Sequence, residues 1–142
     1  AQTLNQVLLL SLPEFMSSEQ QRASEAGLER YFKAVSAAVG KEDKLEGIAK
    51  CFAEGSELIS PNGSVFKGPE GAKQFYSSPT SPVLGEGFAP QPDKGTMCWT
   101  PDGRTVAVEI ALTLPAKVIP VGDWFTFDTE GRITRLRIYS GM

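Results

Sequence analysis

Hydrophobic residues recur with helical spacing in the first third of the chain. Leu28, Phe32 and Val35 lie four and three residues apart, so an α-helix would place them on one face. A pair of serines at positions 17–18, with glutamines shortly after, is typical of a helix start. Gly40 is a typical stop. The pattern therefore predicts a first helix between these two points.

Two shorter helices are predicted to follow. After Asp43, apolar residues at Leu45, Ile48 and Phe52 form a second helical stripe, which Gly55 is expected to end. The third helix should open at Gly68-Pro69, because proline is favoured at the first helical position. It is predicted to end near Ser77.

The second half of the chain alternates between apolar and polar residues, which is the spacing of a half-buried strand. Val106, Val108 and Ile110 would lie on one side of such a strand, with Ala107 and Glu109 on the other. Earlier, the pair Asn-Gly between two short apolar runs is a hairpin signal. The predicted strands are 57–59, 64–67, 96–99, 105–114, 117–128 and 133–140, with a long proline- and glycine-rich loop over 78–95.

Helices that gather on one face of a mainly antiparallel sheet define an α+β fold. We expect residues 17–142 to form a single cone-shaped domain in which three N-terminal helices pack on a strongly curved, mixed sheet and enclose a pocket. Residues 1–16 are interpreted as an N-terminal extension. Its apolar run at 7–10 lacks a basic segment and is too short for a secretory signal.

Composition narrows the chemistry that this domain could carry. The net charge of −3 argues against a nucleic-acid surface. No stretch approaches the roughly 20 apolar residues of a membrane span, and we expect a cytoplasmic protein. The chain has no histidine, which excludes histidine-dependent triads, and it has no CxxC pair for zinc. Acid–base work therefore falls to Asp, Glu, Tyr, Lys or Cys, and we expect neither a metal nor a cofactor.

Asp123 has the sequence context of a buried carboxyl. It lies two residues after Val121 and two before Phe125, so alternation places its side chain on the apolar face of its strand. Desolvation there would raise its pKa. A buried phenol needs a partner, and Tyr31 beside the first helix's apolar face is a natural one. The alternative is a structural pair of core residues.

Several segments together resemble the nuclear transport factor 2-like superfamily, which includes ketosteroid isomerases and SnoaL-like polyketide cyclases. The resemblance covers roughly residues 20–140 and is specific for the fold. Its segments are Leu28-Glu-Arg-Tyr-Phe-Lys-Ala-Val35, Phe52-Ala-Glu-Gly55, Ser60-Pro61, Gly68-Pro-Glu-Gly-Ala-Lys-Gln-Phe-Tyr76, Gly122-Asp-Trp-Phe-Thr-Phe-Asp-Thr-Glu-Gly-Arg-Ile133 and Tyr139.

The resemblance to ketosteroid isomerases implies a site. Tyr31, Asp123 and Tyr76 match the positions of the residues that form and support the oxyanion hole in those enzymes. The isomerase base, an aspartate just before a proline, is replaced here by Ser60, which cannot take a proton from carbon at neutral pH. The expected ligand-binding residues are Ser60, Phe75, Phe125, Leu136, Ile138 and Ser140.

Two functions follow from these expectations. The first is a cofactor-independent isomerase or cyclase that acts on an apolar carbonyl compound, such as a polyketide, terpenoid or steroid-like molecule, through enolate stabilisation. The second is a non-catalytic domain that binds a small apolar ligand or acts as a dimeric scaffold. In either case we expect a homodimer through the outer sheet face, to which Trp124 should point.

Overall fold

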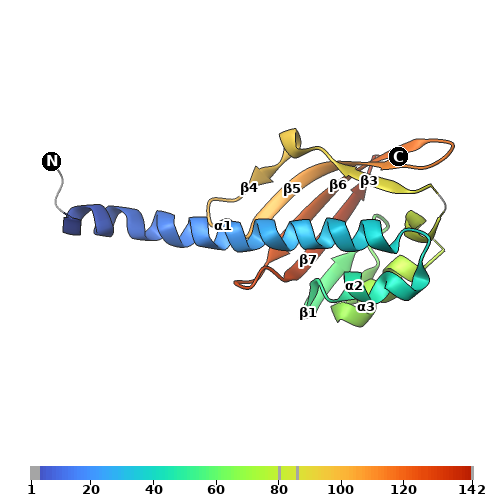
Figure 1. Ribbon diagram of the computed structural model, residues 1–142, viewed down its shortest axis with the longest axis horizontal. Helices are drawn as coiled ribbons and strands as arrows, with labels where there is room; N and C mark the ends of the chain where they lie inside the picture. The colour runs from blue at the N-terminus through green and yellow to red at the C-terminus, as the bar shows by residue number, and fades with distance from the viewer. Residues whose placement is uncertain (1–3, 80, 86, 142) are drawn as a thin grey trace.

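The computed structural model describes residues 4–79, 81–85 and 87–141, with side chains from residue 18 onward. Figure 1 shows a long helix that crosses a curved sheet, with two short helices at one end. None of the helices in the described residues is long and apolar enough to cross a membrane. The helices are α1 (Leu4–Ala38), α2 (Leu45–Ala49) and α3 (Gly68–Ser77), and the strands are β1 (Phe52–Ile59), β2 (Val65–Lys67), β3 (Ala89–Pro92), β4 (Cys98–Trp99), β5 (Thr105–Thr113), β6 (Val118–Phe127) and β7 (Ile133–Ser140).

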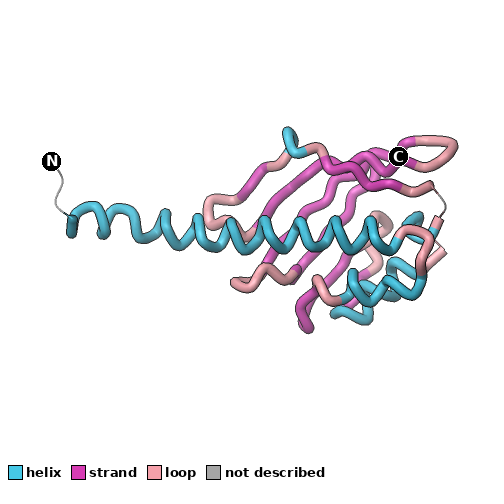
Figure 2. The backbone as a smooth tube through the Cα atoms, viewed as in Figure 1, coloured by secondary structure: helices cyan, strands magenta, loops and turns pink. Residues whose placement is uncertain are grey.

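The seven strands form one mixed, unclosed sheet. Its order is β2-β1-β7-β6-β5-β3, and β4 pairs with β5 at the same edge as β3. Only β1 and β7 run parallel, while the other pairs are antiparallel. The helices gather on one face of this sheet, as Figure 2 shows. The predicted α+β fold is therefore confirmed.

The core lies between this face and α1. Alternate residues of β5 and β6 point into it, as their predicted alternation requires. Phe125 and Leu136, which are neighbours across β6 and β7, are fully buried there. Tyr31 lies edge-on to the ring of Phe125, with ring centroids 5.2 Å apart. Such aromatic packing fixes the position of the α1 side chains over the sheet.

The largest corrections concern the start of the first helix, the end of the second and the predicted loop, while α3 and β7 have the predicted ends. The first helix begins at Leu4, and its first turns extend beyond the sheet in Figure 1; residues 1–3 of the predicted extension lie outside the described residues. The second helix ends at Ala49, and Phe52 belongs to β1, where it pairs with Ile133. Within the predicted loop, residues 89–92 form β3 because β5 offers them an open edge.

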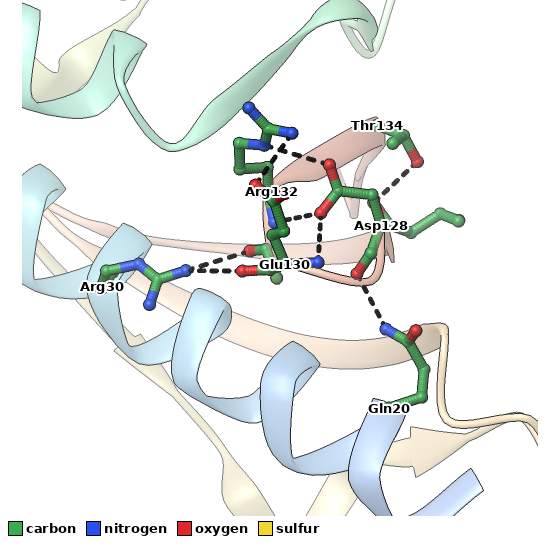
Figure 3. Close-up of polar contacts among 8 residues, drawn as sticks. Gln20, Arg30, Asp128, Glu130, Arg132 and Thr134 are labelled. Atoms are coloured by element: carbon green, nitrogen blue, oxygen red, sulfur yellow. Dashed lines mark hydrogen bonds and ion pairs between the residues drawn. The ribbon is translucent and has the colours of Figure 1, made fainter. Parts of the chain in front are cut away.

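Helix α1 is fastened to the turn between β6 and β7 (Figure 3). The side-chain amide of Gln20 donates to the carbonyl oxygen of Asp128 at 2.8 Å. Further along α1 toward its C-terminus, Arg30 donates to the carbonyl oxygen of Gly131 at 3.4 Å. Between these two contacts, the backbone of Gly27 lies directly against Gly131. This contact sets the position of α1 along the sheet.

The outer face of the sheet carries exposed aromatic side chains. Trp124 and Tyr139 each keep 50% of their surface exposed. The guanidinium of Arg137 lies 4.9 Å from the centre of the Tyr139 ring, within the range of a cation–π contact. Trp124 thus points outward as expected, and the homodimer through this face stays a prediction.

Candidate functional site

A cavity of about 340 Å³ lies between the helices and the inner face of the sheet. Aromatic rings, prolines and aliphatic side chains make up most of its wall. Its volume is at the small end of ordinary ligand pockets. The cone is therefore open. A scaffold with a plugged pocket would instead require a cone that is filled by its own side chains.

Exposure distinguishes the mouth of the cavity from its closed end. Pro61 and Asn62, in the turn between β1 and β2, line the cavity and are exposed. Tyr31, Tyr76 and Asp123 also line it but are 4–5% exposed. A ligand that enters past the turn would therefore reach the two phenols and the carboxyl last.

Asp123 provides the carboxyl group of the closed end. It lies in the middle of β6, between Val108 on β5 and Ile138 on β7. Among the described residues, its Oδ1 atom is buried and has no hydrogen-bond partner. Desolvation by this burial raises the pKa of Asp123 from 3.8 to about 7, since an apolar environment disfavours the charged form.

Tyr31 on α1 and Tyr76 on α3 form a hydrogen-bonded pair of phenols in the same part of the cavity. Burial raises the pKa of both phenols, and the nearby Asp123 raises them further. Both groups are therefore neutral at physiological pH and remain hydrogen-bond donors. This arrangement corrects the expected pairing of Tyr31 with Asp123, because the Tyr31 hydroxyl contacts Tyr76 instead.

Ring packing holds these phenols in place. The Tyr31 ring lies 5.3 Å from that of Phe32, edge to face. Tyr76 packs against Phe75 with ring centroids 4.9 Å apart. Because a neighbouring ring packs against each tyrosine ring, the two hydroxyls are already in place at the cavity wall and need not reorganise when a ligand binds.

The described lining contains one carboxylate, from Asp123, and no lysine or arginine. A carboxyl with a pKa near 7 is partly ionised at neutral pH, so it can both accept and release a proton. Of the two neutral phenols beside it, one donates to the other, and the remaining O–H can donate to a ligand oxygen. Elsewhere in the described residues, no cluster of three or more His, Cys, Asp or Glu side chains is arranged to hold a metal ion.

Most of the other predicted ligand-binding residues line the cavity. Ser60, Phe75, Ile138 and Ser140 are among them. Phe125 and Leu136 are a correction, because they are fully buried in the core and do not contribute to the cavity wall.

Sequence reasoning missed the part of the wall that comes from the proline-rich segment. Val83 and Phe88 are buried and line the cavity, together with Ser81 and two prolines. Isolated large apolar residues inside a segment rich in Pro and Gly are a usable signal, because exposed loops seldom need them. These side chains complete the described wall of the cavity.

Comparison with known proteins identifies the fold. The first match is the epoxide hydrolase/cyclase-like enzyme SalBIII, which has a role in pyran ring formation in the polyether salinomycin; identity is 21%, coverage 87% of this chain and 95% of that chain, and the TM-score 0.67. A steroid delta-isomerase from Pseudomonas aeruginosa is 20% identical over 84% of this chain and 80% of that chain, with a TM-score of 0.61. An NTF2-like protein of unknown function from Cytophaga hutchinsonii is 17% identical over 82% and 88%, with a TM-score of 0.57.

The chain therefore has the nuclear transport factor 2-like fold, which it shares with isomerases and cyclases. No family model matches the sequence, and no curated protein matches it. The likeness concerns the fold, which hosts many activities, so the function has to be argued from the site.

Proposed function

We propose that this protein is a cofactor-independent enzyme of the isomerase or cyclase kind, which moves a proton on an apolar carbonyl compound. One observation carries the proposal. A buried carboxyl, Asp123, faces an apolar cavity beside two neutral phenols, and its Oδ1 atom has no hydrogen-bond partner among the described residues. A protein that only filled its core would place an apolar residue there, since an unpartnered buried carboxyl is costly.

In the proposed reaction, the Asp123 carboxylate takes a proton from the carbon next to the carbonyl group. The electron pair of the broken C–H bond forms a C=C bond, and the carbonyl π electrons move to oxygen. Tyr31 or Tyr76 donates a hydrogen bond to the resulting enolate. Since Asp123 is the carboxyl of the described lining, it also returns the proton, either to the same carbon or to the far end of a conjugated system.

A second candidate function is binding without catalysis. It is favoured by Ser60, which stands where the isomerases that the sequence resembles have their base. The same cavity would then hold an apolar carbonyl ligand, with the phenols as donors to its oxygen. Proton exchange at carbon distinguishes the two functions, because a binding protein has no reason to accelerate it.

The test uses trans-decal-2-one, a bicyclic ketone that fits a cavity of this size, in D2O. The wild-type protein should replace the hydrogens next to the carbonyl by deuterium faster than buffer does, as followed by NMR. Because the base must be ionised, the rate should rise about tenfold between pH 6 and pH 8, around the Asp123 pKa of about 7. Binding without exchange would favour the second function. If the protein neither bound the ketone nor accelerated its exchange, both functions would be contradicted.

Removing one phenol should slow this exchange strongly. Tyr31→Phe keeps the ring and its packing but removes a donor to the enolate, and we expect a loss of about 10²- to 10³-fold. The matched control is Tyr139→Phe, which removes an exposed phenol from the outer sheet face. Since the two hydroxyls act as a bonded pair, Tyr31→Phe combined with Tyr76→Phe should lose little more than the worse single variant. Full additivity would contradict a shared role.

A further inference from the structure

Ser60 is a further polar group of the cavity wall, contributed by the end of β1. It follows the last residue of β1, is 6% exposed and lines the cavity. Its hydroxyl donates to the side-chain oxygen of Asn62 in the turn that follows. The turn itself is closed by two backbone hydrogen bonds, from Ser60 to Ser64 and from Gly63 to Ser60, each 2.9 Å long.

The direction of the Ser60 hydrogen bond is set by a third group. The backbone N–H of Ser64 donates to the same Asn62 Oδ1 atom at 3.0 Å. An amide nitrogen could not accept this bond, so the atom shared by the two contacts is the oxygen. The Ser60 hydroxyl must therefore act as the donor. Its proton is engaged within the turn, and only its lone pairs remain for a ligand.

Strand register places Ser60 in the same row as Asp123. Ile59 of β1 pairs with Arg137 of β7. One residue further along these parallel strands, Ser60 lies beside Ile138, which pairs with Asp123 of β6. Two strand spacings, about 10 Å between the backbones, separate the serine from the carboxyl. A small ligand that lies across Ile138 would therefore reach both ends of the row.

The two ends of the row offer opposite hydrogen-bonding groups. The Asp123 end lies in the part of the cavity that holds the neutral phenol pair, which donates to a carbonyl or enolate oxygen. The Ser60 end presents an oxygen that can only accept. A ligand hydroxyl would satisfy this acceptor, whereas an ether or a second carbonyl would bring its lone pairs against those of the serine and lose a hydrogen bond.

We propose that Ser60, oriented by Asn62, is a specificity-determining residue that accepts a hydrogen bond from the substrate, so that the preferred substrates are apolar hydroxy ketones. The inference rests on the proposed function in one respect only, namely that the cavity binds apolar carbonyl compounds with the oxygen at the phenols. It concerns binding and does not depend on proton transfer.

Three probes test this preference: trans-decal-2-one, its 6-hydroxy derivative and its 6-methoxy derivative. Their dissociation constants are measured by NMR titration. For the wild-type protein, the hydroxy ketone should bind about threefold to tenfold more tightly than the methoxy ketone, as one hydrogen bond would give. In Ser60→Ala this advantage should disappear, so that the hydroxy and methoxy ketones bind with similar constants.

Asn62 supplies a second variant whose outcome a purely steric role would not produce. In Asn62→Ala, the Ser60 hydroxyl becomes free to donate, so the methoxy ketone should gain affinity and the hydroxy-to-methoxy ratio should fall towards one. Asn62→Asp is the matched control, because its carboxylate still accepts from Ser60 and Ser64. There the ratio should stay at the wild-type value.

The outcomes separate this inference from the proposed function. Equal binding of the hydroxy and methoxy ketones to the wild type would overturn the inference about Ser60, and so would a preference that persists in Ser60→Ala. A failure of all three probes to bind would overturn it as well. A Ser60-dependent preference in a protein that exchanges no α hydrogens would support the inference while contradicting the enzymatic proposal. Exchange of α hydrogens without a preference for the hydroxy ketone would support the enzymatic proposal while contradicting the inference about Ser60.

Discussion

Replacing Asp123 by asparagine is expected to slow the exchange of α hydrogens by about 10²- to 10⁴-fold and, at pH 8, to make the protein more stable. Both effects have one cause. The cavity places the carboxyl where it can reach a substrate, but it provides no hydrogen bond to its buried Oδ1 atom among the described residues. Function and stability therefore make opposite demands on this position.

The sign of the stability effect follows from the two pKa values. Asp123 has a pKa of about 7 in the folded protein and 3.8 as its reference value. Between these pH values, the folded chain retains a proton that the unfolded chain has released. The contribution of protonated Asp123 to the free energy of unfolding is therefore fully present below about pH 3.8. It is lost as the pH rises from there through 7, by roughly 4 kcal/mol in total. Asparagine cannot ionise and removes this dependence.

Urea unfolding at pH 5 and pH 8 checks the expectation. From pH 5 to pH 8, the wild-type protein should lose about 3 kcal/mol relative to Asp123→Asn. The lowered pKa of Asp128 acts in the opposite direction and at more acidic pH, and it is common to both proteins. Glu109→Gln, which removes an exposed carboxyl from the neighbouring strand β5, should leave exchange and pH dependence unchanged. Parallel stability curves for wild type and Asp123→Asn would show that Asp123 is not buried as described.

Gly27→Ala is expected to destabilise the protein by about 3 kcal/mol or more, although alanine is the better helix former by about 1 kcal/mol. A Cβ atom on Gly27 would lie 2.0 Å from the carbonyl oxygen of Gly131. The turn cannot easily move away, because Gly131 has a φ of +79° and packs so closely that a Cβ atom on it would lie 2.3 Å from the carbonyl oxygen of Ala23. Arg30 also holds this turn to α1 (Figure 3).

A second helical glycine provides the matched control. Gly47 in α2 has no atom within 4 Å of the position where a Cβ would stand. Gly47→Ala should therefore be neutral or stabilising by up to about 1 kcal/mol. Chemical denaturation measures both variants. If Gly27→Ala were as stable as Gly47→Ala, the close packing of α1 against the β6–β7 turn would be wrong.

The sequence by itself determined the parts of the fold that depend on local pattern. Alternation placed Asp123 on the same strand face as Val121 and Phe125, and all three are buried. Pro69 in the first turn of α3 marked its start. These features follow from the period of a strand or the chemistry of a helix end, which a short stretch of chain carries within itself.

Only the tertiary structure decided which side chains of the site meet. Tyr31 bonds to Tyr76 rather than to Asp123, because the distance between α1 and α3 depends on how both pack on the sheet. The open cavity depends in the same way on the summed volumes of side chains from distant segments, including Phe88. Periodicity gives the direction of a side chain from its own strand or helix. It does not give the separation between elements, which long-range packing such as the Gly27–Gly131 contact sets.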